Sequence, residues 1–352
     1  MSAQGPLAAP QAGRSQAGGS QEGAPERAQA EPDEGVRTEA SRSTPEDTRA
    51  STGGNAPDLT TAPPPIVRGE PVEVADGVHV IPDGRVELVP NVGIVVGADA
   101  ALVIDTGIGP RNGAYVLERA RELAGDRKLY LTVTHFHPEH GFGAQAFKGA
   151  ATILYNRGQR DELRRKGAAY LDMFKGLSEA VAAELVDVTL VDPDVTYEGR
   201  AELDLGGRVA ELRPVGPAHT ASDQTVLVDG RVLFGGDLIE TRIFPIAPYF
   251  PPYDTDVDGD RWIAVLDELL ALDPEIVVSG HGEVTDAALI RDVRDYLVYV
   301  RAETARLRAR GASADETAAA VDKAARARWT TWERPEWIGL AARAFYADGG
   351  AA

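Results

Sequence analysis

Apolar and polar positions alternate in short runs over the first part of the folded sequence, which predicts β-strands. Two such stretches, VEVADGVHVI and RVELVPNVGIVVGADAALVIDTG, contain turns at Asp-Gly and Gly-Ala-Asp. The segment Pro110–Ala124 places its apolar residues on one side of a helix, and two further strands, LYLTVTH and ATILYN, follow it. The charged, periodic segment Gly158–Leu185 predicts two helices divided near Gly176.

The second half of the chain repeats this order of strands followed by helices. The stretches AELDLGGRVAELRPV and QTVLVDGRVLFGGD predict two hairpins with Gly-Gly and Asp-Gly turns. A helix is expected from about Asp260 to Leu272, followed by the strand EIVVSG. Beyond Thr285 the pattern is helical, with a last helix near Glu336–Tyr346. Strands followed by helices, twice over, predict an α+β fold of two stacked halves whose sheets share an interface.

The composition divides the chain into three parts. Residues 1–70 contain no aromatic side chain and are rich in Ala, Gly, Pro and Glu. Such a segment buries too little apolar surface to offset its conformational entropy, so we predict a disordered tail. Residues 71–285 hold the predicted sheets, and residues 286–352 form a helical extension. Apolar residues at helical spacing predict that this extension packs on the core: Leu289, Val293, Leu297 and Val300.

Cysteine content and charge narrow the chemistry. The 352 residues include no cysteine, which excludes disulfides, zinc-thiolate sites and a cysteine nucleophile. Any metal must therefore be held by His, Asp or Glu. The net charge of −19 argues against a general affinity for nucleic acid. Without a long apolar run or a recognisable leader, we expect a cytoplasmic protein with no membrane partner and a small-molecule substrate. A homodimer stays open.

Three histidines and a glutamate lie within six residues, directly after a predicted strand. A strand projects residues i and i+2 to the same side, so His135 and His137 converge on one point. Pro138 then turns the chain, which allows Glu139 and His140 to face a second point nearby. Neutral imidazoles and carboxylates are ligands that zinc accepts. This cluster therefore predicts a metal site.

Other predicted strands are also followed by a residue of a type that can bind metals. His219 lies in a loop of Gly, Pro and Ala, Asp237 follows the run LFGG, and His281 lies between two glycines. Loops on a rigid scaffold are the usual location of functional sites, so we expect these residues to join the histidine cluster. His79 alternates with valines inside a strand and is left out of the site.

In this order along the chain, these histidines and the aspartate resemble the metal-binding signature of the metallo-β-lactamase superfamily. The resemblance covers roughly residues 72–285. It includes the motif IDTG at Ile104–Gly107 and the motif AHT at Ala218–Thr220. It implies a four-layer αβ/βα sandwich with the metals at one edge of the two sheets, to which the C-terminal helices are added.

The resemblance also implies a binuclear zinc centre. Position by position, it assigns His135, His137 and His219 to a first metal, Glu139, His140 and His281 to a second, and Asp237 to both. Asp105 falls at the family's structural aspartate and would support the ligands from behind. Asn91 lies where the family often has a similar polar residue, which we interpret as structural.

One position departs from the family. The motif here is HxHxEH, whereas the family usually has HxHxDH, so the carboxylate of Glu139 is one methylene longer. A small shift of the loop would leave two metals bound. Without such a shift, the second site would be weaker. The sequence leaves both outcomes open.

The family's chemistry implies a hydrolase in which a metal-bound hydroxide attacks the substrate. Glu139 and Asp237 would be the catalytic carboxylates, the first accepting a proton and the second positioning the nucleophile. We expect a small ester, thioester or lactone-like substrate. The alternative is an enzyme like the persulfide dioxygenases, with a single iron. A non-catalytic binding protein of the same fold is a third hypothesis.

The segment Ile239–Asp256 is a candidate wall of the substrate pocket. It directly follows Asp237 and contains aromatic residues among prolines: Phe244, Tyr249, Phe250 and Tyr253. A rigid aromatic loop beside a metal site is typical of a binding pocket. Packing of the loop on the sandwich would explain the same pattern. The helical segment 158–185 is expected to form the opposite wall.

Overall fold

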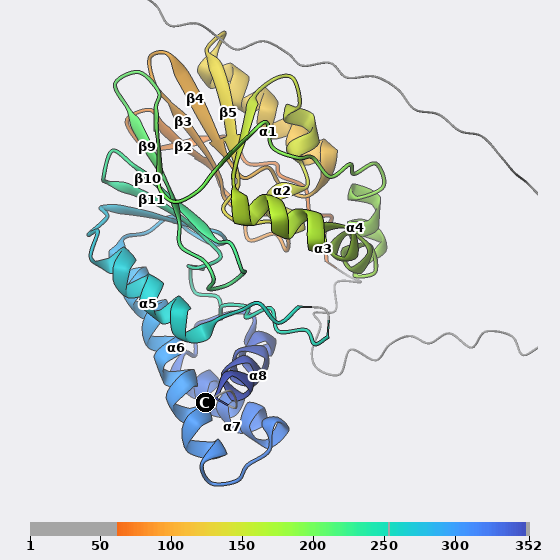
Figure 1. Cartoon of the computed structure of the whole chain (residues 1–352), viewed down its shortest axis with the longest axis vertical. Coiled ribbons are helices and arrows are strands. Elements are labelled where there is room, and N and C mark those ends of the chain that lie inside the picture. The colour runs from red at the N-terminus through yellow and green to blue at the C-terminus, as the bar shows by residue number, and fades with distance from the viewer. Residues whose placement is uncertain (1–61, 253, 350–352) are drawn as a thin grey trace, which may run out of the picture. The chain divides into compact units, whose positions relative to one another are not determined.

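The computed structural model describes residues 62–252 and 254–349, which contain two β-sheets (Figure 1). The strands of the first sheet lie side by side in chain order. They are β1 (Val72–Ala75), β2 (Val78–Ile81), β3 (Val92–Val96), β4 (Ala100–Ile104), β5 (Lys128–Thr132), β6 (Thr152–Asn156) and β7 (Val195–Tyr197). Neighbours from β1 to β4 are antiparallel, and neighbours from β4 to β7 are parallel.

The second sheet has the order β12-β11-β10-β9-β8. Its strands are β8 (Ala201–Asp204), β9 (Val209–Pro214), β10 (Gln224–Val228), β11 (Val232–Gly236) and β12 (Ile276–Ser279). The strands β8 to β11 form an antiparallel meander, and β12 pairs with β11 in parallel. The two hairpins predicted from their Gly-Gly and Asp-Gly turns are thereby confirmed.

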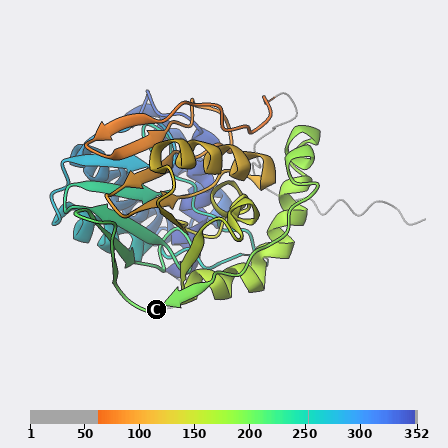
Figure 2. The same ribbon diagram turned by 90° about the horizontal axis from the view of Figure 1, so that it is seen from above.

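Helices cover the outer faces of both sheets. The α-helices are α1 (Gly109–Ala124), α2 (Pro138–Gly141), α3 (Arg157–Lys175), α4 (Glu179–Glu184), α5 (Gly259–Leu270), α6 (Ala287–Arg308), α7 (Ala314–Arg328) and α8 (Ile338–Asp348). Figures 1 and 2 show α1 beside the first sheet and α5 beside the second. Among the described residues, no helix has both the length and the apolar character needed to cross a bilayer.

The alternation of side chains along each strand creates the layers. In β4, Ala101 and Val103 pack with α1, whereas Leu102 and Ile104 face the second sheet. In β10 and β11 the pattern is the same, because one set of side chains packs against α5 and the other against the first sheet. Since neighbouring residues of a strand point to opposite faces, each sheet is buried on both sides. The predicted αβ/βα sandwich is confirmed.

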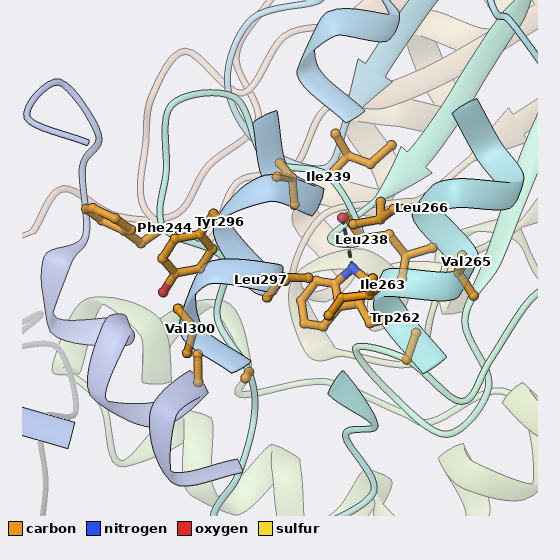
Figure 3. Close-up of a cluster of buried hydrophobic side chains, with 14 of the residues drawn as sticks. Leu238, Ile239, Phe244, Trp262, Ile263, Val265, Leu266, Tyr296, Leu297 and Val300 are labelled. Atoms are coloured by element: carbon orange, nitrogen blue, oxygen red, sulfur yellow. Dashed lines mark hydrogen bonds between the residues drawn. The ribbon is translucent and has the colours of Figure 1, made fainter. Parts of the chain in front are cut away.

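The hydrophobic cluster around α5 and α6 also packs against the chain just after β11 (Figure 3). Leu238 and Ile239 pack among residues of α5 and α6. Trp262 of α5 is completely buried, and its Nε1 donates a hydrogen bond to the carbonyl oxygen of Leu238, 3.1 Å away. Phe244 lies against Tyr296 of α6, with ring centroids 5.3 Å apart. The helices after residue 286 therefore support the loop that follows Asp237.

The prediction of a disordered tail over residues 1–70 is wrong for residues 62–70. Val67 is only 2% exposed, and its backbone N–H donates to Asn112 Oδ1 of α1 at 2.8 Å. Asn112 Nδ2 in turn donates to the carbonyl oxygen of Pro65. The buried side chains of Pro65 and Val67 and the hydrogen bonds to a buried asparagine order this segment, which contains no aromatic residue of its own. Residues 1–61 lie outside the described part of the chain.

A substitution at Gly113 of α1 tests whether the close approach of another backbone segment to this helix stabilises the fold. A Cβ at this position would lie 2.1 Å from the carbonyl oxygen of Gly143, a backbone atom just beyond α2. We expect Gly113→Ala to lower the free energy of unfolding by about 1–3 kcal/mol, although alanine favours helix. Urea unfolding measures the change. Gly339→Ala in α8 is the control, because its Cβ would meet no atom within 4 Å. Equal stability of the two variants would contradict this packing.

Candidate metal centre

The histidine motif lies between the end of β5 and the start of α2. His135 and His137 belong to the short connection after β5, and both are buried. Pro138 occupies the first turn of α2, where a missing N–H is harmless, and α2 places Glu139 and His140. All four side chains are at most 7% exposed. A strand end and one helical turn thus deliver four polar side chains into the interior.

A first group of ligand atoms comes from three histidines and Asp237. His135 Nε2 lies 3.0 Å from His137 Nδ1, and His219 Nε2 lies 3.2 Å from that same atom. Nitrogen ligands of one tetrahedral zinc ion are about 3.3 Å apart, given bonds of about 2.0 Å. The spacing of the three ring nitrogens therefore suits one shared ion.

A second group combines Glu139, His140, Asp237 and His281, with ligand atoms within 4.8 Å of one another. Asp237 connects the two groups through its two oxygens. Its Oδ1 lies 3.1 Å from His140 Nε2 and 3.7 Å from His281 Nε2. Its Oδ2 lies 3.8 Å from His135 Nε2 in the first group. The carboxylate of Asp237 therefore stands between the groups, as expected for a bridging ligand.

The position of Asp237 depends on glycines at the ends of two neighbouring strands. Gly236, the last residue of β11, has a φ of 54°, which turns the chain into the site. A Cβ on Gly280, which follows β12, would lie 2.0 Å from Asp237 Oδ1. Only glycine allows the backbone of this strand end to approach the carboxylate so closely.

The outward-facing nitrogens of four histidines are fixed by acceptor groups. His140 Nδ1 bonds to Asp105 Oδ2 at 2.9 Å. His219 Nδ1 faces the carbonyl oxygen of Ile246 at 3.0 Å, and His281 Nδ1 faces that of Val89 at 2.9 Å. His135 Nδ1 lies 3.1 Å from the hydroxyl of Thr134. With the proton on Nδ1, each ring turns the lone pair of Nε2 towards the site, as metal ligands require.

Asp105 lies directly behind the ligands. Its backbone has a φ of 69°, a strained conformation at the turn after β4. Its Oδ1 accepts the N–H of Thr134 at 2.7 Å, and its Oδ2 accepts the hydroxyl of Thr134 at 2.9 Å. Because that hydroxyl donates to Asp105, its lone pairs remain for the Nδ1–H of His135. One carboxylate therefore orients His140 directly and His135 through Thr134.

Buried hydrogen bonds also hold the loops that carry His219 and His281. Asp223 accepts the N–H and the hydroxyl of Thr220 beside His219, and burial raises the pKa of Asp223 to about 8. The Nδ2 of Asn91 donates to the carbonyl oxygens of Ser279 and Gly282 on either side of His281. Asn91 thus has the structural position expected from the sequence.

The buried polar atoms of the site fit a metal better than they fit one another. Four residues of the two ligand groups have a buried atom without a hydrogen-bond partner among the described residues: His137 Nε2, Glu139 Oε2, His140 Nε2 and Asp237 Oδ1. A buried polar atom without a partner costs about 1–3 kcal/mol. Three of these atoms belong to residues of the second group, where His140 Nε2 and Asp237 Oδ1 lie 3.1 Å apart. A divalent cation there would satisfy them together.

The pKa values indicate that the same histidines can act as metal ligands. Burial lowers the pKa of His219 to about 4, and burial with neighbouring histidines lowers the pKa values of His135 and His137 well below the usual range. These rings are therefore neutral and able to bind a metal. Burial would also lower the pKa of His140, but Asp237 and Asp105 outweigh burial and raise it well above the usual range. Without a metal, His140 attracts a proton into the second group.

Glu139 reaches the second group despite its longer side chain. It lies on α2, one residue before His140, and is 7% exposed. Burial raises the pKa of Glu139 to about 7. Burial would likewise raise the pKa of Asp237, but His140 and His281 outweigh burial and hold it well below the usual range. A cation that binds in this dry group must therefore displace the protons that Glu139 and His140 hold.

The aromatic residues proposed as a wall of the substrate pocket do not share one location. Phe244 is 1% exposed and belongs to the core with Tyr296 and Trp332, so packing explains it and no surface remains for a substrate. Tyr249 is half-buried against the same core, and Phe250 is half-buried at a backbone pair with Asp254. Tyr253 lies outside the described residues.

Two side chains near the ligands were not predicted from the sequence. Tyr170 of α3 stacks on the ring of His137, with centroids 5.2 Å apart and planes inclined by 22°. Glu240 is 1% exposed, and its Oε2 has no hydrogen-bond partner. Burial and the nearby carboxylate of Asp237 raise the pKa of Glu240 well above its usual range. The only sequence signal for Tyr170 is its place one helical turn after Lys166 on the segment 158–185.

Comparison with known proteins finds alkylsulfatases and metallo-β-lactamases. The linear primary-alkylsulfatase of Pseudomonas sp. (strain ATCC 19151) is 24% identical over 257 residues, which are 62% of this chain and 47% of that protein. The chain therefore spans about half the length of this curated relative.

Solved structures show the same fold at low sequence identity. The sec-alkylsulfatase Pisa1 from Pseudomonas sp. aligns over 80% of this chain and 50% of its own, with 16% identity and a TM-score of 0.60. A metallo-beta-lactamase from Pontibacter korlensis aligns over 66% of this chain and 99% of its own, with 20% identity and a TM-score of 0.51.

A family model also matches this chain, over a stretch that contains every residue of the two ligand groups. The model of the metallo-beta-lactamase superfamily matches residues 85–281, which is more than half of the chain. The matched stretch extends from before β3 to the last residue of the two ligand groups. The chain belongs to the metallo-beta-lactamase superfamily.

Proposed function

We propose that the protein is a hydrolase that holds two divalent metal ions, zinc being the expected metal, and cleaves a small ester. One observation carries this proposal: Asp237 lies between two buried ligand groups and turns one carboxylate oxygen towards each. An enzyme with a single iron would need only one of these groups. The presence of both therefore favours two ions over the mononuclear alternative.

The residues of the site have separate tasks in this reaction. When bound, such ions lower the pKa of a coordinated water towards about 7 and polarise the bond that is attacked. Asp237 keeps the two ligand groups at a fixed separation. Glu139 would accept a proton, and its Oε2, which has no hydrogen-bond partner among the described residues, supports this role. The burial of the ligands excludes bulk water, which strengthens every charge interaction in the site.

The candidate substrate classes share one kind of reaction, which is hydrolysis. Carboxylic esters, thioesters and lactones are the substrates expected from the family resemblance, and the similarity to a linear primary-alkylsulfatase adds alkyl sulfates. In each of them, water attacks an electrophilic centre and a leaving group departs. Because that relative is matched over only 47% of its length, all four classes belong in the first assay.

Metal content is the first test of the proposal. We expect about two zinc ions per chain by elemental analysis of protein purified without added metal, and loss of hydrolysis after chelation. Free metal at about 100 times its Kd should raise the free energy of unfolding by about 2.7 kcal/mol. Asp237→Asn should lose metal and at least about 100-fold in kcat/KM, whereas Glu202→Gln on the exposed edge strand β8 should change neither. A single iron per chain would contradict the proposal.

Glu139 allows the second ion to be tested separately. Glu139→Gln removes the charge with little change in size, so we expect the bound metal to fall from about two ions to about one. Glu139→Asp restores the residue usual in the family and should retain both ions. Metal analysis and calorimetric titration measure the difference. Two tightly bound ions in Glu139→Gln would exclude Glu139 as a ligand.

The two ligand groups should respond differently to pH. In the metal-free protein the pKa of Glu139 is about 7 and that of His140 is raised. Both of these side chains, which belong to the second ligand group, therefore hold protons as the pH falls below neutrality. A second ion must displace these protons, and its affinity should fall as the pH drops through about 7. The first group should keep its ion, since the pKa of His219 is about 4. Titrations at about pH 7.5 and pH 6 measure this, and earlier loss of the first ion would contradict it.

A further inference from the structure

His137 differs from the other ligand histidines in how its ring is held. The rings of His135, His140, His219 and His281 each have an acceptor for their outer nitrogen. The outer nitrogen of His137, Nε2, is buried and has no hydrogen-bond partner among the described residues. Its Nδ1 faces the first ligand group. No hydrogen bond behind the ring therefore sets its orientation.

Aromatic side chains surround the His137 ring instead. Tyr170 of α3 stacks nearly parallel to it at 5.2 Å, and Phe136 approaches it edge-on at 4.9 Å. Phe136 and Tyr170 also contact each other, with centroids 4.9 Å apart. An aromatic face favours a ring that carries positive charge, which an imidazole acquires when it binds a cation.

The orientation of Tyr170 is itself fixed. Its hydroxyl donates to the carboxylate of Asp254, which lies in the loop after Asp237. Lys166, one turn earlier on α3, donates to both oxygens of Asp254 at 2.8 and 2.9 Å and to Glu162 at 2.8 Å. Lys166, Glu162, Asp254 and Tyr170 are all at most 7% exposed. A buried charged network thus holds the aromatic ring against the ligand.

We propose that Tyr170 is a positioning residue that orients His137 for the first metal through the face of its ring, in place of the hydrogen bond that the other ligand histidines have. This inference rests on the proposed function, because it assumes a metal in the first group. Tyr170 does not have to touch the substrate. Its contribution is the angle of the His137 ring and hence the direction of the Nδ1 lone pair.

Three variants on α3 separate the ring of Tyr170 from its hydroxyl and from packing. Tyr170→Phe keeps the stacked face, Tyr170→Leu removes it, and Phe174→Leu is the matched control. Phe174 lies one turn further in the same cluster, 6.2 Å from Tyr170. Each is made in full-length protein and also in a His281→Ala background, where only the first ligand group is complete. Cobalt(II) is titrated in, and its visible spectrum and the chelator concentration that releases it are measured.

We expect Tyr170→Leu to weaken cobalt binding in the first group by about tenfold or more and to change the spectrum. Tyr170→Phe and Phe174→Leu should stay within about threefold of the parent protein. Should Tyr170→Leu not fold, Tyr170→Met removes the ring with a flexible side chain that adapts to the space left, and it has the same expected result. Unchanged binding in Tyr170→Leu, or equal losses in both leucine variants, would overturn the inference. Absence of metal binding in the unaltered protein would instead refute the proposed function.

Discussion

Six side chains, five of them buried, surround the buried carboxylate of Asp237, and the close approach of their ligand atoms is the constraint on which the site depends. Backbone carbonyls, Thr134 and Asp105 hold the outer nitrogens of four histidines, so the inner nitrogens can bind a cation once the proton that His140 attracts is displaced. Acceptors that face each other in a dry interior destabilise the fold unless a cation joins them. The surrounding hydrogen bonds therefore hold these side chains in an arrangement that suits a cation.

The sandwich supplies this arrangement because strand ends from both sheets meet at one edge. The first sheet provides Asp105 after β4 and the histidine motif after β5, and the second provides Asp237 after β11 and His281 after β12. Neighbouring parallel strands end at the same edge of a sheet. The ends of β4 and β5 therefore lie side by side, as do the ends of β11 and β12. Gly280 then lets the second pair of strand ends approach closely enough for Asp237 to reach both groups.

The surroundings of the site connect parts of the chain that are distant in sequence. The loop after Asp237 is held at its start by Trp262 and the helical extension, and near its end by Lys166 of α3. A loop fixed at both ends keeps the carbonyl oxygen of Ile246 against His219. The helical extension therefore contributes to the geometry of the metal centre, although the ligands themselves all precede it.

The sequence by itself determined the strands, the major helices and the residues proposed as ligands, because alternation of apolar residues and closely spaced histidines are local signals. It could not show that residues 62–70 pack on α1, since Val67 and the hydrogen bonds of Asn112 depend on a partner 45 residues away. Only the tertiary structure placed Phe244 in the core and Tyr170 on His137. An aromatic residue has the same local pattern in either role, and the contact that distinguishes the roles comes from another segment. The reach of Glu139 was likewise decided by α2, whose single turn directs a longer side chain into the second group.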